Sequence, residues 1–223
     1  MKLGVLLPTF CDNANDALAL ADRAQRAGLD GVFAFDHLWP IGSPERPALA
    51  PMPVLGAVAA RFSVSVGTLV ARVGLVGEAK LVEQFTTLEA IAPGRVIAAL
   101  GTGDDLSKPE HDAYGIDYPS ASERRRLLSD AVTALAPLMN VWCGAGSPAT
   151  NTVAREHGVA LNLWGVAAHV VREEAANGPV TWAGPLGRDA TATLSALEEA
   201  GATWAVVSVP APLDELKEWR RSH

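Results

Sequence analysis

An acid and an imidazole stand side by side at Asp36 and His37, directly after the apolar run Gly31–Phe35. Such a run predicts a short buried strand that ends in these two polar side chains. An imidazole exchanges protons near neutral pH, and an adjacent carboxylate can hold its tautomer and favour its cation. We therefore expect His37 to act as a general acid/base with Asp36 as its partner. The alternative is a structural histidine that hydrogen-bonds a neighbouring loop.

A second carboxylate, Asp104, follows the apolar run Arg95–Leu100. If that run is a strand, Asp104 and the preceding Gly103 lie at its carboxyl end. There, a carboxylate could shuttle protons or polarise a substrate hydroxyl. The alternative is an aspartate that caps a helix or lies in solvent within an acidic loop. His111 and Asp112, a few residues further on, are expected on the surface of a loop.

Small residues connect the predicted strand Asn140–Cys143 to a helix that has Pro148 in its first turn. Backbone N–H groups at such a helix start bind phosphate through their alignment and the helix dipole. The candidate phosphate ligands are Gly144, Ala145, Gly146 and Ser147. The alternative is a plain tight turn. A loose dinucleotide-binding pattern in this stretch is weak, because no acidic residue ends the next predicted strand.

Aromatic side chains near the same strand ends could wall a substrate pocket. We expect Trp39 and Trp164 to bind substrate by stacking, although a tryptophan near a loop more often packs at the edge of a core. The other expected wall residues are Phe10, Val70 and Trp182. Such walls favour an apolar or aromatic small molecule.

About eight short apolar runs predict the strands that carry these groups. They are Lys2–Leu7, Gly31–Phe35, Ser63–Leu69, Arg95–Leu100, Asn140–Cys143, Ala160–Trp164, Val180–Ala183 and Trp204–Val209. Between them, apolar residues recur at helical spacing, as in Leu81, Phe85, Leu88 and Ile91. Fully apolar strands that alternate with amphipathic helices indicate parallel pairing. The pattern predicts an α/β fold in one domain over 1–223, a compact TIM (β/α)8 barrel with one mouth. A doubly wound open sheet is the alternative.

The composition fits a folded enzyme. The chain has 223 residues, is 49% hydrophobic and carries a net charge of −7 from 18 basic and 25 acidic residues. This balance argues against a nucleic-acid or anionic-membrane surface, which needs clustered lysine and arginine. The one basic run, Arg124–Arg126, is expected on a solvated helix face. Cys11 and Cys143 indicate neither a disulfide framework nor a metal site.

Signals for other locations and chemistries are missing from the sequence. No apolar run has membrane-spanning length and the amino terminus opens on a predicted strand, so we expect a cytoplasmic protein. Without an H-x-H strand end or an H-E-x-x-H helix, no metal ligand is predicted. There is no G-x-S-x-G elbow of a serine hydrolase. A cofactor-free barrel aldolase would need a lysine at a strand end, and none ends a predicted strand.

Four stretches resemble the luciferase-like monooxygenases, the flavin- and deazaflavin-dependent barrel enzymes. They are residues 26–39, 65–70, 80–104 and 141–148, and the likeness covers residues 1–165 well and the remainder loosely. The resemblance implies an oxidoreductase with a TIM barrel. In the deazaflavin-using branch, the residue that matches His37 lies over the ring carbon that receives hydride. Sugar-phosphate relatives have a glutamate where Asp104 stands.

The resemblance also implies a cofactor. Residues 36–39, Asp-His-Leu-Trp, are similar to the branch that uses coenzyme F420, the deazaflavin, and FMN is the alternative. The residues expected to bind it are Asp36, His37, Leu69, Val70, Gly103, Gly144, Ala145, Gly146 and Ser147. By position, the non-proline cis peptide that relatives often have against the ring would be Leu69–Val70. Relatives commonly pair, so we expect a homodimer, formed through helices beside strands two to four, that acts on a small molecule.

The sequence departs from the family pattern in two places. Relatives usually carry extra segments between the fourth helix and fifth strand, and again near the seventh strand, and these commonly cover the substrate. Here both connections are short. This shortened member is expected to transfer hydride to or from the cofactor ring, with His37 as acid/base. The alternatives are a catalytically idle flavin-binding homologue and an FMN-dependent monooxygenase.

Overall fold

Nine parallel strands form a single sheet in the computed structural model, which describes residues 1–223. They are β1 Lys2–Leu6, β2 Gly31–Ala34, β3 Ser65–Thr68, β4 Ala71–Arg72, β5 Val96–Gly101, β6 Asn140–Gly144, β7 Ala160–Trp164, β8 Val180–Gly184 and β9 Ala202–Val207. Their order in the sheet is β3-β2-β1-β9-β8-β7-β6-β5-β4. Most of their residues are buried, as is typical of parallel strands covered on both faces.

The sheet closes on itself. β3 also pairs with β5, with Val66 opposite Val96 and Gly67 opposite Ile97, and this contact joins the ends of the sheet. The short strand β4 follows β3 directly and pairs with the later residues of β5. β3 and β4 therefore share one position in an 8-stranded barrel. The predicted TIM barrel is confirmed, and the alternative of an open doubly wound sheet is wrong.

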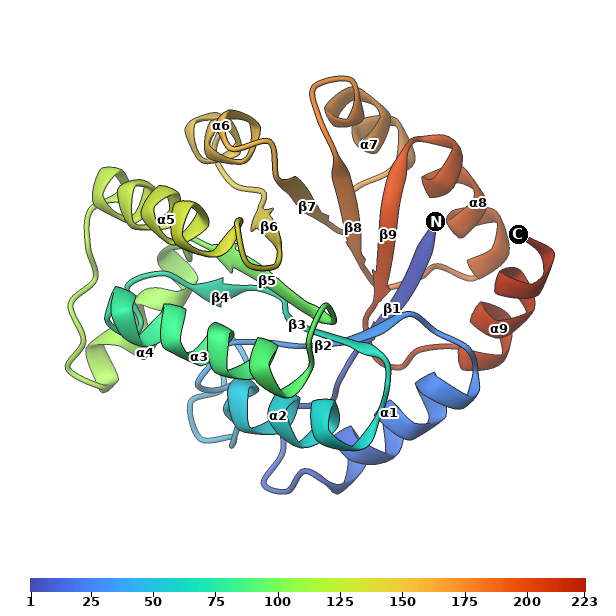
Figure 1. Ribbon diagram of the computed structural model, residues 1–223, viewed down its shortest axis with the longest axis horizontal. Coiled ribbons are helices and arrows are strands. Elements are labelled where there is room, and N and C mark those ends of the chain that lie inside the picture. The colour runs from blue at the N-terminus through green and yellow to red at the C-terminus, as the bar shows by residue number, and fades with distance from the viewer.

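Helices surround the strands in the alternating order that the sequence predicts (Figure 1). They are α1 Asn15–Arg26, α2 Pro51–Arg61, α3 Glu78–Ile91, α4 Lys108–Ala113, α5 Ala121–Leu135, α6 Pro148–Glu156, α7 Ala168–Ala175, α8 Ala190–Glu199 and α9 Leu213–Ser222, with the 3-10 turn η1 at Asp105–Ser107. Both η1 and α4 lie in the connection from β5 to α5. No helix has the length and apolar character needed to cross a membrane.

Aromatic side chains fill the barrel interior. The ring centroid of buried Phe33 lies 5.2 Å from that of Trp142 and 5.7 Å from that of Trp204. Gly4 and Gly67 face this cluster, and a Cβ atom there would lie 2.7 or 2.8 Å from the Phe33 ring. The two glycines are thus required by packing. A second cluster of 47 buried residues packs the strands against the helices.

Element ends and one helix face differ from the sequence prediction. The third strand ends at Thr68, before the predicted Leu69, and the last strand, β9, begins earlier than predicted and ends at Val207 rather than Val209. Ile91 is 46% exposed because it is the last residue of α3, so it does not extend the helix's buried face.

The basic run differs in part from the expected solvated helix face. Arg124 is buried, contrary to the expected solvated face, and its guanidinium carbon lies 4.3 Å from the centroid of the Tyr118 ring. Arg126 is exposed and pairs with Glu123 on the same helix. Both cysteines are free, Cys143 fully buried and Cys11 half-buried.

Candidate active site

A cavity of about 570 Å³ opens at the carboxyl ends of the strands. Its lining residues come from several different strand ends, as in the active sites of TIM barrels. The structure brings together ten of the predicted site residues there: Phe10, His37, Leu69, Val70, Gly103, Asp104, Gly144, Ala145, Gly146 and Trp164. Phe35, Arg72, Ser107 and Asn162 are also part of the lining, among other residues.

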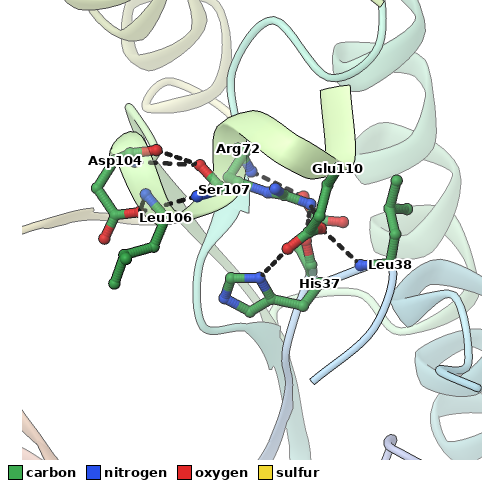
Figure 2. Close-up of polar contacts among 8 residues, drawn as sticks. His37, Leu38, Arg72, Asp104, Leu106, Ser107 and Glu110 are labelled. Atoms are coloured by element: carbon green, nitrogen blue, oxygen red, sulfur yellow. Dashed lines mark hydrogen bonds and ion pairs between the residues drawn. The ribbon is translucent and has the colours of Figure 1, made fainter. Parts of the chain in front are cut away.

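His37 has a partner that the sequence did not reveal. Its Nδ1 atom lies 2.8 Å from Oε1 of Glu110, which comes from α4 and is 1% exposed. Figure 2 shows Glu110 reaching from that helix to the imidazole, whose other ring nitrogen points away from it. Nε2 has no hydrogen-bond partner within the chain and is not among the buried unpartnered atoms. The imidazole thus offers one nitrogen to the cavity.

Asp36 does not hold His37 as expected, because its carboxylate turns to another element. Its Oδ2 atom accepts a hydrogen bond of 2.8 Å from the backbone N–H of Arg72 on β4. Asp36 is also absent from the cavity lining. Burial raises the pKa of Asp36 from 3.8 to about 6, and the Arg72 N–H and guanidinium oppose that rise. Asp36 therefore ties the end of β2 to β4 behind the imidazole.

Arg72 links the two acids. Its side chain is 4% exposed, and Nη2 donates to the backbone carbonyl of Asp36 and, at 2.8 Å, to Oε2 of Glu110. The Arg72 Nε and Nη1 atoms are buried without a partner. Oε2 of Glu110 also accepts from the backbone N–H of Leu38 at 2.8 Å. Neither Arg72 nor Glu110 was a predicted site residue.

The surroundings of Glu110 keep its carboxyl ionised. Burial alone would raise the pKa of Glu110, but the hydrogen bonds from His37 and Leu38 and the charge of Arg72 outweigh it, and its pKa lies below the usual value. An ionised carboxylate only accepts hydrogen bonds, so Nδ1 of His37 is the donor in this pair.

Asp104 caps the 3-10 turn η1, which was the alternative to its predicted role as a catalytic acid. Its Oδ1 atom accepts from the backbone N–H groups of Leu106 at 3.0 Å and Ser107 at 3.2 Å, which caps η1 (Figure 2). The Ser107 hydroxyl oxygen accepts in return from the Asp104 N–H at 3.2 Å. Asp104 lines the cavity and is exposed. His111, expected on a loop surface, is instead buried in α4 with Nδ1 3.0 Å from the Asp117 carbonyl.

The loop after β6 uses several of its polar groups within the chain. The N–H of Ala145 donates to the Asn162 carbonyl at 2.8 Å, and the N–H of Gly146 donates to Oδ1 of Asn151 at 2.9 Å. Ser147 does not line the cavity, and its hydroxyl caps α6 by accepting from the Thr150 N–H at 3.3 Å. Phosphate binding by this loop stays a prediction.

Val70 lies against two glycines at the cavity. The peptide bond between Leu69 and Val70 is cis, which confirms the expectation from the family resemblance. A Cβ atom on Gly101 would lie 2.4 Å from Cγ2 of Val70, and one on Gly144 would lie 3.3 Å from it. The absence of side chains at these two positions leaves room for Val70.

The aromatic wall differs in part from the prediction. The Phe35 ring centroid lies 5.5 Å from that of Phe10 and 5.8 Å from that of Trp164. Trp39 does not line the cavity and stacks on Tyr114 at 6.3 Å. Trp182 is buried outside it and donates from Nε1 to the Val166 carbonyl. Trp39 and Trp182 thus each contact a neighbouring connection outside the cavity.

Asn162 on β7 is a further lining residue that the sequence did not single out. It is 4% exposed, and its Nδ2 atom donates to Oγ1 of buried Thr181 at 2.9 Å. Its Oδ1 atom has no partner in the chain and is not among the buried unpartnered atoms, so it is an acceptor available to the cavity.

Acidic, basic and aromatic side chains gathered at one rim of a closed parallel barrel are the layout of a TIM-barrel enzyme. A family model described as luciferase-like monooxygenase matches residues 1–141. The chain therefore belongs to the luciferase-like monooxygenase family.

Relatives within this family are similar over part of their length. The chain is 35% identical over 136 residues to an F420-dependent glucose-6-phosphate dehydrogenase of Beutenbergia cavernae, which is 58% of this chain and 37% of that protein. It is 34% identical over 132 residues to a protein of the same name from Microbacterium testaceum, 58% of this chain and 38% of that protein. The matches thus span under two-fifths of these curated relatives.

Solved structures share the fold. An F420-dependent secondary alcohol dehydrogenase in complex with an F420-acetone adduct superposes with a TM-score of 0.81 at 16% identity, covering 97% of each chain. The F420-dependent tetrahydromethanopterin reductase of Methanopyrus kandleri gives a TM-score of 0.74 at 13% identity, covering 98% of this chain and 96% of its own.

Proposed function

We propose that this protein is an oxidoreductase that binds coenzyme F420 and transfers hydride between its ring and a small molecule. The observation that carries the proposal is His37, whose Nδ1 is held by Glu110 while Nε2 is available to the cavity. The dehydrogenases named above, which use F420, support the choice of cofactor.

The cavity residues fit a flat tricyclic ring. The cavity volume is about 570 Å³, and the cavity lining includes Leu69 and Val70 as well as the aromatic rings of Phe35 and Trp164. Apolar walls with a few polar groups are typical of cofactor sites. Leu69, Val70 and Gly103 would hold the ring, and the loop after β6 would hold the phosphate of the cofactor. Bound F420 would supply the ring carbon that takes or gives a hydride.

His37 would move the proton that accompanies the hydride. As an alcohol is oxidised, its O–H bond breaks and its proton goes to Nε2, while the electron pair of the C–H bond leaves as hydride. In the reverse direction, the imidazolium returns the proton to the carbonyl oxygen. The aromatic rings of Phe10 and Phe35, whose centroids lie 6.4 and 6.3 Å from that of the His37 ring, would favour an apolar substrate.

A fluorescence titration with F420 and a separate one with FMN test the choice of cofactor. We expect F420 to bind with one site per chain and FMN not to bind. Binding of FMN alone would overturn the proposal in favour of an FMN-dependent monooxygenase.

Replacing the imidazole tests its role. We expect His37→Gln to lower turnover by about 10²- to 10⁴-fold, the usual contribution of a general acid/base, and to leave F420 affinity within a few-fold of the parent. The matched control is His157→Gln, because His157 lies away from the cavity with Nε2 2.9 Å from Oγ of Ser129. A chain that binds F420 and shows no turnover with or without His37 would be the idle homologue.

A further inference from the structure

Three donors fix the Glu110 carboxylate behind His37. Oε1 faces Nδ1 of His37 at 2.8 Å, and Oε2 accepts from Leu38 N–H and from Arg72 Nη2, each at 2.8 Å. Glu110 is 1% exposed, so water does not compete for these bonds. A carboxylate bonded at both oxygens cannot rotate without breaking several charge-assisted hydrogen bonds.

This arrangement selects one tautomer of the imidazole. The ionised carboxylate is an acceptor, so the neutral ring carries its proton on Nδ1 and has a bare lone pair on Nε2. Nε2 is the nitrogen that points away from Glu110 (Figure 2). The opposite tautomer would place two acceptors 2.8 Å apart in a buried position, which is unfavourable.

The charged groups around His37 come from four elements. Glu110 approaches from α4, Arg72 from β4 and Asp36 from the end of β2, and Asp104 on the β5–α5 connection lines the same cavity. Glu110 is the one that contacts the ring directly. The charge of Arg72 helps to lower the pKa of Glu110, which keeps the carboxylate from drawing the proton off Nδ1.

We propose that Glu110 is a positioning residue that holds the proton of His37 on Nδ1, presents Nε2 to the substrate as a base and stabilises the imidazolium once it forms, with Arg72 holding Glu110 in place. The direction of proton transfer rests on the proposed function, whereas the tautomer does not. Nothing in this arrangement requires Asp104, whose carboxylate caps η1.

The tautomer can be measured by NMR in the cofactor-free protein with ¹⁵N-labelled histidine. We expect the neutral His37 ring to show a protonated Nδ1 and a bare Nε2, assigned by loss of the signals in His37→Gln. A neutral ring protonated on Nε2 would overturn the proposal. Because no cofactor is present, this result is independent of whether F420 binds.

A Glu110→Gln variant separates charge from shape. The glutamine oxygen can still accept from Nδ1, but the negative charge that stabilises the imidazolium is lost, so we expect kcat/KM with F420 to fall by about tenfold. The cofactor-free variant should also lose the single tautomer of His37, because the glutamine amide can either accept from Nδ1 or donate to it. The F420 affinity should be unchanged.

The matched control is Asp112→Asn on the same helix, because Asp112 is exposed and pairs with Lys108 at 2.8 Å. It removes one negative charge from α4 without touching His37, and we expect neither kcat/KM nor the tautomer of His37 to change. An unchanged kcat/KM and an unchanged tautomer in Glu110→Gln, with a native far-UV circular dichroism spectrum, would contradict the proposal. If that variant does not fold, the tautomer of His37 in the wild-type protein decides whether the proposal holds.

Discussion

At the scale of single residues, the imidazole of His37 has two nitrogens in two environments. Nδ1 faces a buried carboxylate and Nε2 is available to the cavity. The sequence predicted His37 because the apolar strand and its polar end are contiguous. It could not predict Glu110, which lies 73 residues further along, or the approach of Arg72 to Asp36 from 36 residues away. Such contacts depend on the closed fold.

Asp36 gives a pH prediction at this scale. Its pKa rises from 3.8 to about 6 on folding, so the folded protein holds this proton more tightly than the unfolded chain does. Its contribution to stability is complete below pH 3.8 and is lost as the pH rises through about 6. We expect Asp36→Asn, which keeps an acceptor for the Arg72 N–H, to remove this loss.

Urea unfolding at a series of pH values measures the effect. The free energy of unfolding of the wild-type protein, relative to Asp36→Asn, should fall between pH 4 and pH 6 and then level off. Parallel curves for the two proteins across that window would show that burial does not raise the pKa of Asp36.

At the scale of elements, the β5–α5 connection matters most for the site. The sequence indicated a loop there, whereas the structure has η1 and α4. The signals were present: Asp104 and Ser107 have the spacing of a capping box, and Pro109 lies in the first turn of α4. These signals favour the capping alternative for Asp104, but they do not indicate which side chain α4 directs at His37.

A strand-to-strand contact gives the prediction for this scale. Asn162 on β7, in the lining of the cavity, donates to buried Thr181 on β8. Asn162→Leu would leave the Thr181 hydroxyl without its partner, and we expect a loss of about 1–3 kcal/mol in the free energy of unfolding.

The double variant Asn162→Leu with Thr181→Val tests the cause. Removing both polar groups leaves no buried polar group unsatisfied. The double variant should therefore recover part of the free energy of unfolding that Asn162→Leu loses, as measured by urea unfolding. If the double variant lost as much free energy of unfolding as the two single variants together, this account would be contradicted.

At the scale of the whole molecule, closure brings the strand ends to one rim. The pattern of apolar runs predicted the strands and their parallel pairing, but periodicity is the same in an open and a closed sheet. The contact between β3 and β5 decides between them. No sequence signal marks this contact, because its residues pair through backbone atoms.

We propose that the protein is a homodimer that pairs through α2 and α3. A cavity of about 270 Å³ lies between these helices. Its lining includes apolar Met52, Leu88 and Ile91 beside polar side chains of α3, and Ile91 is 46% exposed. We expect a dimer mass in light scattering after size-exclusion chromatography, and a monomer for Ile91→Asp. The control is Leu138→Asp, an exposed apolar residue after α5, which should stay dimeric. A monomeric wild-type protein would refute the pairing.

The fluorescence of Trp164 can report ligand binding in the cavity. It is 49% exposed at the rim beside Phe35, whereas four other tryptophans are buried: Trp142, Trp182, Trp204 and Trp219. A ligand that binds in the cavity displaces water from the Trp164 indole. The Trp164 emission should therefore shift to the blue, or be quenched by energy transfer if the ligand is coloured. Occupancy could then be followed in real time without any label.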